Sequence, residues 1–115
     1  MINPRLIVVF YMSQSGNEPV RQFLKTLSIE DKKNVGEDIK TVQYGCPLGM
    51  PLVRKIDRDL WEIRTNTQIG ILRIFFTVHA EYLVLLHAFI KKTQKTPMDE
   101  LVIAKRRLSR VRGNK

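Results

Sequence analysis

Four extended, apolar segments follow one another in the second half of the chain, separated by breaks of only a few residues. They cover residues 52–56, 60–65, 70–79 and 82–92. Their content of β-branched and aromatic residues is typical of strands. Parallel neighbours would need a crossover of a dozen or more residues, so connections this short require antiparallel hairpins. The chain is therefore restricted to folds built around an antiparallel sheet.

The rest of the chain supplies one more strand and three helices. Residues 6–11 form a short β-type run, and apolar residues recur at helical spacing over 17–27. Ser28 opens a second helix, and Pro97 stands at the start of a last helix whose end is basic. The predicted order is β-α-α-β-β-β-β-α, an α+β architecture that occupies residues 1–115 as one domain.

The composition is that of a globular chain. A hydrophobic content of 43% argues against disorder, and 115 residues suffice to bury a core without a disulfide. The single cysteine, Cys46, has no partner for an internal disulfide, as is usual in a reducing compartment. No apolar run approaches the roughly 18 residues of a membrane span. We therefore expect a soluble, cytoplasmic domain.

The positive charge is concentrated in the second half of the chain. The formal net charge is +9, and residues 51–115 carry 14 of the 20 Lys and Arg residues but only 6 of the 11 Asp and Glu residues. Such an asymmetry favours a polyanionic partner. Nucleic acid is favoured over an anionic membrane surface, because the basic stretches do not lie opposite a strongly apolar helix face.

Two arginines stand inside predicted strands. Alternation along the strands places Arg64 and Arg73 on faces opposite the most regular apolar stripes. An arginine in a strand needs water or a partner, because an unpaired buried charge is costly. A basic, partly apolar sheet face suits single-stranded RNA, which is held by cations on its phosphates and by planar groups under its bases.

Several common catalytic motifs are absent from the sequence. There is no glycine-rich phosphate loop before a helix and no G-x-S-x-G motif. One cysteine and two histidines, His79 and His87, do not make a zinc-binding pattern. The acidic residues form no two-metal pattern. If the protein is an enzyme, we expect it to use cationic side chains, with no metal and no other cofactor.

Five pieces of the sequence, in matching order and spacing, together resemble one known superfamily. They are residues 51–56 (PLVRKI), 60–64 (LWEIR), 70–76 (GILRIFF), 85–97 (LLHAFIKKTQKTP), and Glu100 with 104–107 (AKRR). This series resembles the phage-derived, HigB-type branch of the RelE/ParE toxin superfamily and covers nearly the whole chain. The resemblance implies a RelE-like fold, in which two N-terminal helices and a C-terminal helix pack on a curved antiparallel sheet.

The resemblance also implies a function in a type II toxin–antitoxin module. RelE and HigB members cleave mRNA in the ribosomal A site, whereas ParE members poison gyrase. The motifs of the second half look like the RNA-cleaving branch, so the expected activity is that of an endoribonuclease that inhibits translation. The implied partners are mRNA, the ribosome and a HigA-like helix-turn-helix antitoxin. DNA would be contacted only through that antitoxin, and no membrane partner is expected.

The implied chemistry is RNA scission without a metal ion. The 2′-hydroxyl attacks the adjacent phosphate and leaves a 2′,3′-cyclic phosphate and a 5′-hydroxyl. The reaction needs a base, an acid and cations that stabilise the extra phosphoryl charge. An unperturbed lysine is a poor base, with a pKa of about 10.4. Neighbouring cations lower that pKa, and the ribosome can order the substrate.

The resemblance carries four cationic residues over as candidate catalytic groups. Arg73 matches the strand arginine that contacts the scissile phosphate, with a salt bridge to Glu62 as the structural alternative. Arg64 matches a position that is often basic and catalytic, whereas Glu62 is acidic where some relatives are basic. Lys91 and Lys92 match the basic pair that ends the last strand, and one of them is expected to reach substrate phosphate. Replacing Arg73 by alanine is expected to relieve growth arrest without unfolding the domain.

His87 is a further candidate, as a general acid or base near neutral pH. Alternation along its strand puts the ring on the side of Leu85 and Phe89, so a satisfied core histidine is the alternative interpretation. Several relatives place a tyrosine late in the chain, but this sequence has no aromatic residue after Phe89.

Other basic residues are candidates for contacts with RNA or the ribosome. They are Arg54, Lys55, Lys95, Arg106 and Arg107. Each has a structural alternative, because lysines on edge strands prevent aggregation and cations compensate the dipole at a helix C-terminus.

Two other functions remain open on the sequence. One is a ParE-like toxin directed at gyrase, which would be a protein-binding inhibitor and no nuclease. The other is a non-catalytic, phage-derived RNA-binding protein. A helix-turn-helix protein encoded by the adjacent reading frame would favour a toxin over the second of these.

Overall fold

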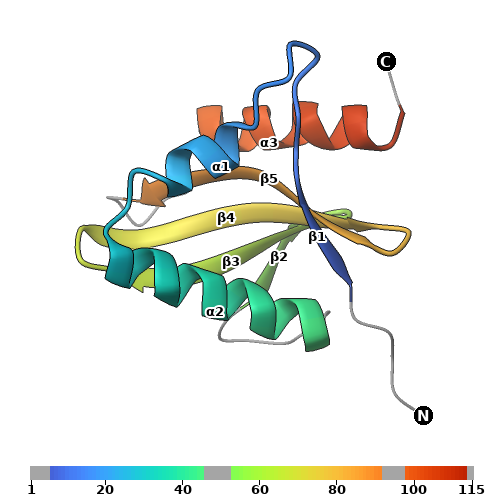
Figure 1. The fold of residues 1–115 in the computed structure, drawn as a ribbon. Helices are drawn as coiled ribbons and strands as arrows, with labels where there is room; N and C mark the ends of the chain where they lie inside the picture. Colours follow the sequence, from blue (N-terminus) through green and yellow to red (C-terminus); the bar gives the residue numbers. More distant parts are fainter. Residues whose placement is uncertain (1–5, 46–52, 92–97, 114–115) are drawn as a thin grey trace.

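The computed structural model describes residues 6–45, 53–91 and 98–113 (Figure 1). Within these ranges the elements follow one another in the predicted order. They are β1 (Ile7–Phe10), α1 (Pro19–Leu24), α2 (Ile29–Gly45), β2 (Val53–Asp57), β3 (Leu60–Thr67), β4 (Gly70–His79), β5 (Tyr82–Lys91) and α3 (Met98–Val111). The α+β class is confirmed, and the described strand ends lie within two residues of their predicted positions. The predicted helix start at Pro97 lies outside the described residues.

One sheet of five strands, in the order β1-β5-β4-β3-β2, forms the centre of the molecule (Figure 1). The strands from β2 to β5 are antiparallel neighbours, as their short connections predict. β1 instead pairs with β5 in parallel, so the sheet is mixed. Two helices separate β1 from the hairpins, and a connection of that length does not require antiparallel pairing.

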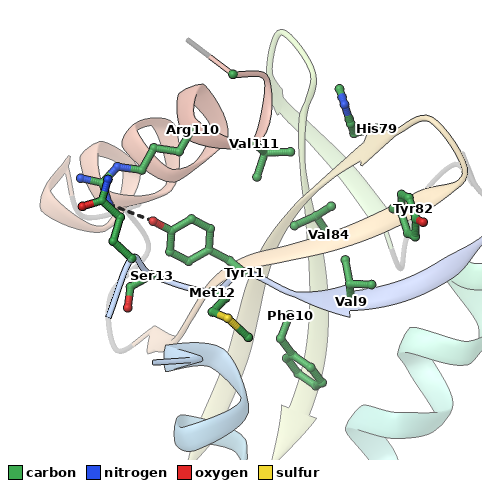
Figure 2. Close-up of a pocket in the computed structure, with 12 residues that line it drawn as sticks. Val9, Phe10, Tyr11, Met12, Ser13, His79, Tyr82, Val84, Arg110 and Val111 are labelled. Atoms are coloured by element: carbon green, nitrogen blue, oxygen red, sulfur yellow. Dashed lines mark hydrogen bonds between the residues drawn. The ribbon is translucent and has the colours of Figure 1, made fainter. Parts of the chain in front are cut away.

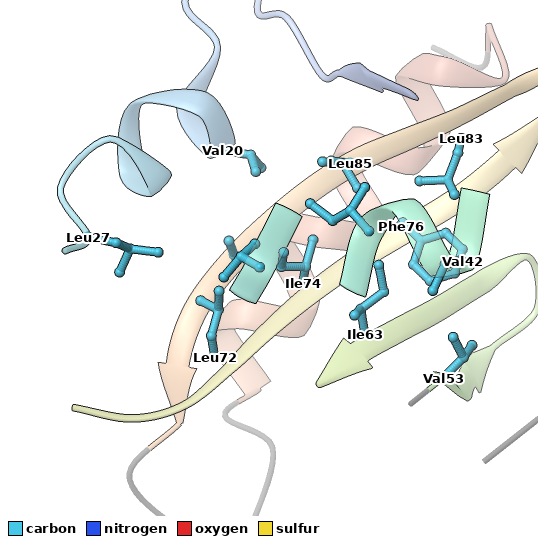
Figure 3. Packing of buried hydrophobic residues seen from close by; sticks show 13 residues of the cluster. Val20, Leu27, Val42, Val53, Ile63, Leu72, Ile74, Phe76, Leu83 and Leu85 are labelled. Atoms are coloured by element: carbon cyan, nitrogen blue, oxygen red, sulfur yellow. The ribbon is translucent and has the colours of Figure 1, made fainter. Parts of the chain in front are cut away.

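Helices cover both faces of the sheet (Figure 1). α1 and α2 pack on one face, where Val20 and Val42 join Phe76 in an apolar cluster (Figure 3). α3 packs on the other face, where Ala104 joins Phe75 in a second cluster. None of the helices in the described ranges is long and apolar enough to cross a membrane.

Side-chain hydrogen bonds fix α2 and join it to β3. The Asp31 backbone N–H donates to the Ser28 hydroxyl at 3.1 Å, which caps the helix where the sequence predicts its start. The Thr65 hydroxyl donates to the Asp38 carboxylate at 2.7 Å. This bond anchors the part of β3 that also carries Arg64, whose side chain is on the opposite face.

A β-bulge in β5 interrupts the alternation of its side chains. Phe75 pairs with His87 and Phe76 pairs with Leu85, so Leu86 has no partner of its own in β4. Leu86 is buried in the α3-side cluster, whereas Leu85 is buried in the cluster under α1 and α2.

The alternation that the sequence predicts for β5 is therefore wrong beyond Leu86. His87 lies on the α3 face and shares no face with Leu85, whereas Phe89 does lie beside it. Lys91 follows Phe89 on the α3 face. The physical reason is that side chains alternate between the two faces of a sheet. One inserted residue therefore moves every later side chain of the strand to the face opposite the predicted one.

Gly70 begins β4 in a conformation that other residues rarely adopt, with a φ of 138°. A Cβ atom there would lie 2.9 Å from Ile90 Cγ2. We predict that Gly70→Ala lowers the free energy of unfolding by about 1–3 kcal/mol, measured by urea denaturation. Gly36→Ala is the control, because a Cβ on this α2 residue meets no atom within 4 Å. It is expected to raise stability by about 0.5–1 kcal/mol, and an equal loss in both variants would contradict the prediction.

Candidate functional site

Basic side chains from four neighbouring strands gather on the α3 face of the sheet. Arg64 of β3 is directly opposite Arg73 of β4, and Arg54 of β2 is opposite Glu62 of β3. Lys91 of β5 is close enough to Arg54, Arg64 and Arg73 for each to lower its pKa by charge repulsion. We call Arg54, Arg64, Arg73 and Lys91 the basic cluster. Glu62 adds a carboxylate to it.

Arg73 and Glu62 form a buried ion pair at the centre of the basic cluster. Arg73 Nη1 donates to Glu62 Oε1 at 2.9 Å, and the two side chains are 6% and 0% exposed. The salt bridge that the sequence offers as the structural alternative for Arg73 is therefore present. Arg73 Nε and Glu62 Oε2 have no hydrogen-bond partner among the described residues. The pair holds β3 and β4 together and cancels one of the four positive charges.

Lys91 lies at the edge of the basic cluster and is only 9% exposed. Burial lowers the pKa of the Lys91 ammonium, and repulsion from Arg73 lowers it further, while the attraction of Glu62 acts in the opposite direction. A lysine of lowered pKa has more of its neutral amine at neutral pH, which makes it a better proton acceptor than an exposed lysine. Burial and neighbouring cations thus shift Lys91 towards the neutral amine, which an ordinary lysine rarely forms at neutral pH.

Arg64 is half-buried and Arg54 is exposed. Neither side chain forms an ion pair or hydrogen bond with another residue in the described part of the chain. A free guanidinium presents its planar fork of N–H groups to an anion, and the fork matches a phosphate. These two arginines are therefore the members of the basic cluster that are best placed to hold a ligand.

His87 lies on the same face but belongs to a separate network with α3. Its Nε2 lies 2.5 Å from Glu100 Oε1, and its Nδ1 lies 3.3 Å from Arg107 Nη1. A guanidinium can only donate, so Nδ1 accepts and Nε2–H donates to the carboxylate. Arg107 Nη1 also donates to the carbonyl of the bulge residue Leu86 at 2.8 Å. Both ring nitrogens are thus engaged, and His87 stacks on Phe89, as a structural histidine does.

The other candidates from the sequence are spread over the molecule. Lys55 is exposed and pairs with Trp61, whose ring stacks on Phe76, so its side chain is on the face opposite the basic cluster. Arg106 and Arg107 lie on α3. The candidates Lys92 and Lys95 lie outside the described residues.

An apolar groove of about 670 Å³ lies between β1 and the C-terminal end of α3 (Figure 2). Val9, Met12 and Val84 line it, and the Arg110 guanidinium donates to the Tyr11 hydroxyl at its rim, at 2.9 Å. No residue of the basic cluster lines this groove. The sequence does not predict it, because its two walls are about a hundred residues apart in the chain.

The described ranges contain no group of three or more His, Cys, Asp or Glu side chains that could hold a metal ion. The residues available for chemistry on the α3 face are cations, with Glu62 and Glu100 each already paired to one of their basic neighbours.

The fold and the basic cluster define a class of protein. The class is a small α+β domain of the RelE-like type, with cations on the sheet face under its C-terminal helix. A comparison with family models gives the family: the model described as phage-derived protein Gp49-like (DUF891) matches residues 22–109. The chain belongs to this Gp49-like family, which is part of the RelE/toxin-like superfamily. A search of curated proteins found no match.

Proposed function

We propose that this protein is the HigB-type toxin of a type II toxin–antitoxin module and cleaves mRNA in the ribosomal A site. The observation that carries the proposal is the convergence of four cations on one sheet face with a single carboxylate, Glu62, among them. Membership of a toxin-like family supports it. A toxin that acts on ribosomes works in the cytoplasm, where we place this protein.

The basic cluster supplies two of the three functions that RNA scission by a 2′-hydroxyl needs, the cations and the base. Arg64 and Arg54 bind the non-bridging oxygens of the scissile phosphate and stabilise the charge that grows in the transition state. The neutral amine of Lys91 removes the proton of the 2′-hydroxyl. The 2′-oxygen then bonds to phosphorus, the bond from phosphorus to the 5′-oxygen breaks, and that oxygen takes up a proton from a water molecule as it leaves.

Arg73 has two roles in this scheme. Its guanidinium holds the Glu62 carboxylate through Nη1, and its positive charge helps to lower the pKa of Lys91. The charge stabilisation comes from side chains fixed by the sheet, so the scheme needs no metal ion or other cofactor.

We also propose a cognate antitoxin that covers the basic cluster. An inhibitor of a cationic site is expected to present acidic groups to it, because complementary charge speeds association and fixes orientation. A HigA-like antitoxin with a helix-turn-helix domain would at the same time carry the toxin to its operator DNA.

Arg64→Ala tests the proposed nuclease activity. With purified ribosomes and a defined mRNA, we predict that wild-type protein cuts the A-site codon and that the variant cuts about 10²–10³-fold more slowly. The unfolding free energy is expected to change by no more than about 0.5 kcal/mol, because Arg64 has no partner in the described chain. Lys40→Ala removes one charge from an exposed α2 residue and is expected to cut like wild type.

The assay also separates the alternatives. Mapping of the 5′ ends reports where the mRNA is cut, and a supercoiling assay reports inhibition of gyrase. Intact mRNA together with blocked supercoiling would show that the protein is a gyrase-directed toxin. Binding of RNA without any cleavage would show a non-catalytic RNA-binding protein.

A further inference from the structure

A basic groove lies between α3 and the loop that joins β1 to α1, and the proposed reaction does not use it. Its volume is about 500 Å³. One wall carries Arg106, Arg107 and Arg110 of α3, and the other carries the hydroxyls of Ser13 and Ser15. No Asp or Glu is among its lining residues.

Two of the three arginines, Arg107 and Arg110, are held in place by neutral groups. Arg107 donates to the Leu86 carbonyl, and its guanidinium carbon lies 5.3 Å from the centre of the Tyr11 ring. Arg110 donates to the Tyr11 hydroxyl at 2.9 Å (Figure 2). Arg106 is exposed and has no partner in the described part of the chain. None of the three forms an ion pair with a described carboxylate, so the groove keeps three uncompensated positive charges.

Burial and repulsion within the groove both act on the pKa of Arg107. Burial lowers the pKa of its guanidinium, and the charges of Arg106 and Arg110 lower it further. An arginine stays protonated at neutral pH in spite of such shifts. The three charges therefore oppose one another until an anion enters the groove.

The opposite wall is a loop fixed by its own hydrogen bonds. The Asn17 backbone N–H donates to the Ser13 hydroxyl at 3.1 Å, and the Asn17 side-chain amide donates to the Ser15 hydroxyl at 3.2 Å. Gly16 takes a φ of 90°, which closes the turn between them. The two hydroxyls also hydrogen-bond to each other at 3.1 Å, so the loop need not be reordered on binding, which lowers the entropy cost of binding a ligand.

We propose that this groove is a second phosphate site, which binds the backbone of RNA away from the scissile bond. Arginine forks and hydroxyls are the groups that bind phosphodiester oxygens. Arg106 and Arg110 are one helical turn apart, about 6 Å along the axis, so they can contact successive phosphates of one strand. The inference extends the proposed function, since it assigns the groove to the same RNA or to the ribosomal RNA around it.

The groove lies close enough to the basic cluster for one strand of RNA to reach both. His87, which accepts from Arg107, precedes Lys91 by four residues on the same face of β5. At about 3.3 Å per residue this is about 13 Å, a distance that a few nucleotides can span.

Binding of a fluorescent single-stranded RNA of twelve uridines to the purified full-length protein tests the proposal. The test variant is Arg106→Ala with Arg110→Ala, and Arg107 is kept because it bonds the β5 bulge. We expect the affinity to fall about tenfold and the slope of log K against log salt to become smaller by about 1.4, which is two phosphate contacts. The charge-matched control, Lys32→Ala with Lys33→Ala on the exposed side of α2, is expected to retain most of the affinity. Equal losses in test variant and control would overturn the proposal.

A second variant distinguishes an effect on folding from an effect on binding. Arg106→Lys with Arg110→Lys keeps both charges but loses the planar forks. It is expected to keep most of the salt dependence and only part of the affinity. Both variants are expected to keep the wild-type urea midpoint. If the lysine variant then binds as weakly as the alanine variant, the planar guanidinium forks carry the binding rather than the positive charge alone, which still supports the site.

Two further arms identify the source of the phosphate. A loss of affinity for free RNA assigns the groove to mRNA, whereas a loss seen only with ribosomes assigns it to ribosomal RNA. Unchanged binding to both would overturn the proposal, and loss of binding to polyglutamate alone would show a site for an acidic protein instead. If wild type cleaves mRNA and Arg106→Ala with Arg110→Ala binds RNA as tightly as wild type, only the proposal for the groove is refuted. Arginine-dependent RNA binding without any cleavage refutes only the nuclease.

Discussion

Arg73→Ala is expected to lower the free energy of unfolding by about 3–5 kcal/mol, because it leaves the Glu62 carboxylate buried without its partner. A domain of this size has a total stability of about 5–15 kcal/mol, so the loss is a large fraction of the total and is expected to move the unfolding transition to a much lower urea concentration. Urea denaturation followed by the fluorescence of Trp61 measures the loss, since this ring stacks on Phe76 in the neighbouring strand.

The matched control replaces both members of the pair. Glu62→Leu with Arg73→Met removes two buried charges together and is expected to recover most of the lost stability. This double variant, rather than Arg73→Ala, tests the function of Arg73, because it is expected to fold but to lack the guanidinium that helps to lower the pKa of Lys91. If Arg73→Ala keeps the wild-type unfolding curve, the ion pair has no structural role.

The ion pair changes how a loss of toxicity must be interpreted. The sequence predicts that Arg73→Ala relieves growth arrest while the domain stays folded. The burial of Glu62 argues against the second half of that prediction, because the variant would leave a buried carboxylate without its partner. Growth of cells that express Arg73→Ala would therefore reflect unfolding as much as chemistry, and it would not identify a catalytic residue.

Lys91→Met has the opposite expected profile, with a large loss of activity and a smaller loss of stability than Arg73→Ala. We predict that the rate of mRNA cleavage falls about 10²–10⁴-fold, as when a general base is removed. The free energy of unfolding is expected to fall less than in Arg73→Ala, because methionine fills a similar volume and leaves the buried Arg73–Glu62 pair intact. Lys40→Met, at an exposed α2 position, is the matched control and is expected to change neither quantity.

The lowered pKa of Lys91 also predicts how stability depends on pH. Its pKa is lower in the folded state than its ordinary value of 10.5, first by burial and then by repulsion from Arg73. Below the lowered pKa both states carry the charge, and the folded state bears the cost of burying it. As pH rises from the folded pKa towards 10.5, the folded state loses its proton first, so the stability of wild type increases relative to that of Lys91→Met.

Cleavage should follow the same titration. If the neutral amine of Lys91 is the base, the logarithm of the single-turnover rate rises with pH until the folded pKa is passed and is then level. A variant that keeps the wild-type rate, or a wild-type rate that does not depend on pH over this range, would remove Lys91 from the proton transfer.

Local pattern determined most of the secondary structure and part of the site. Breaks of a few residues between 52 and 92 leave hairpins as the only connection, and the structure has antiparallel neighbours throughout that region. Alternation in unbroken strands also put Arg64 and Arg73 opposite the apolar stripes, and the salt bridge to Glu62, the structural alternative for Arg73, is present in the structure. These features depend on contacts between near neighbours in the chain, which is why the sequence alone suffices for them.

Tertiary structure decided which side of the sheet the end of β5 presents. The extra residue Leu86 turns His87 and Lys91 to the α3 face, and the Leu86 carbonyl at this bulge is bonded by Arg107 from α3. Both partners of the His87 ring, Glu100 and Arg107, also come from that helix. A two-residue period carries no information about an inserted residue whose hydrogen bond is made some twenty positions further along the chain. For the same reason, the parallel pairing of β1 and the groove beside α3 became visible only when distant segments were brought together.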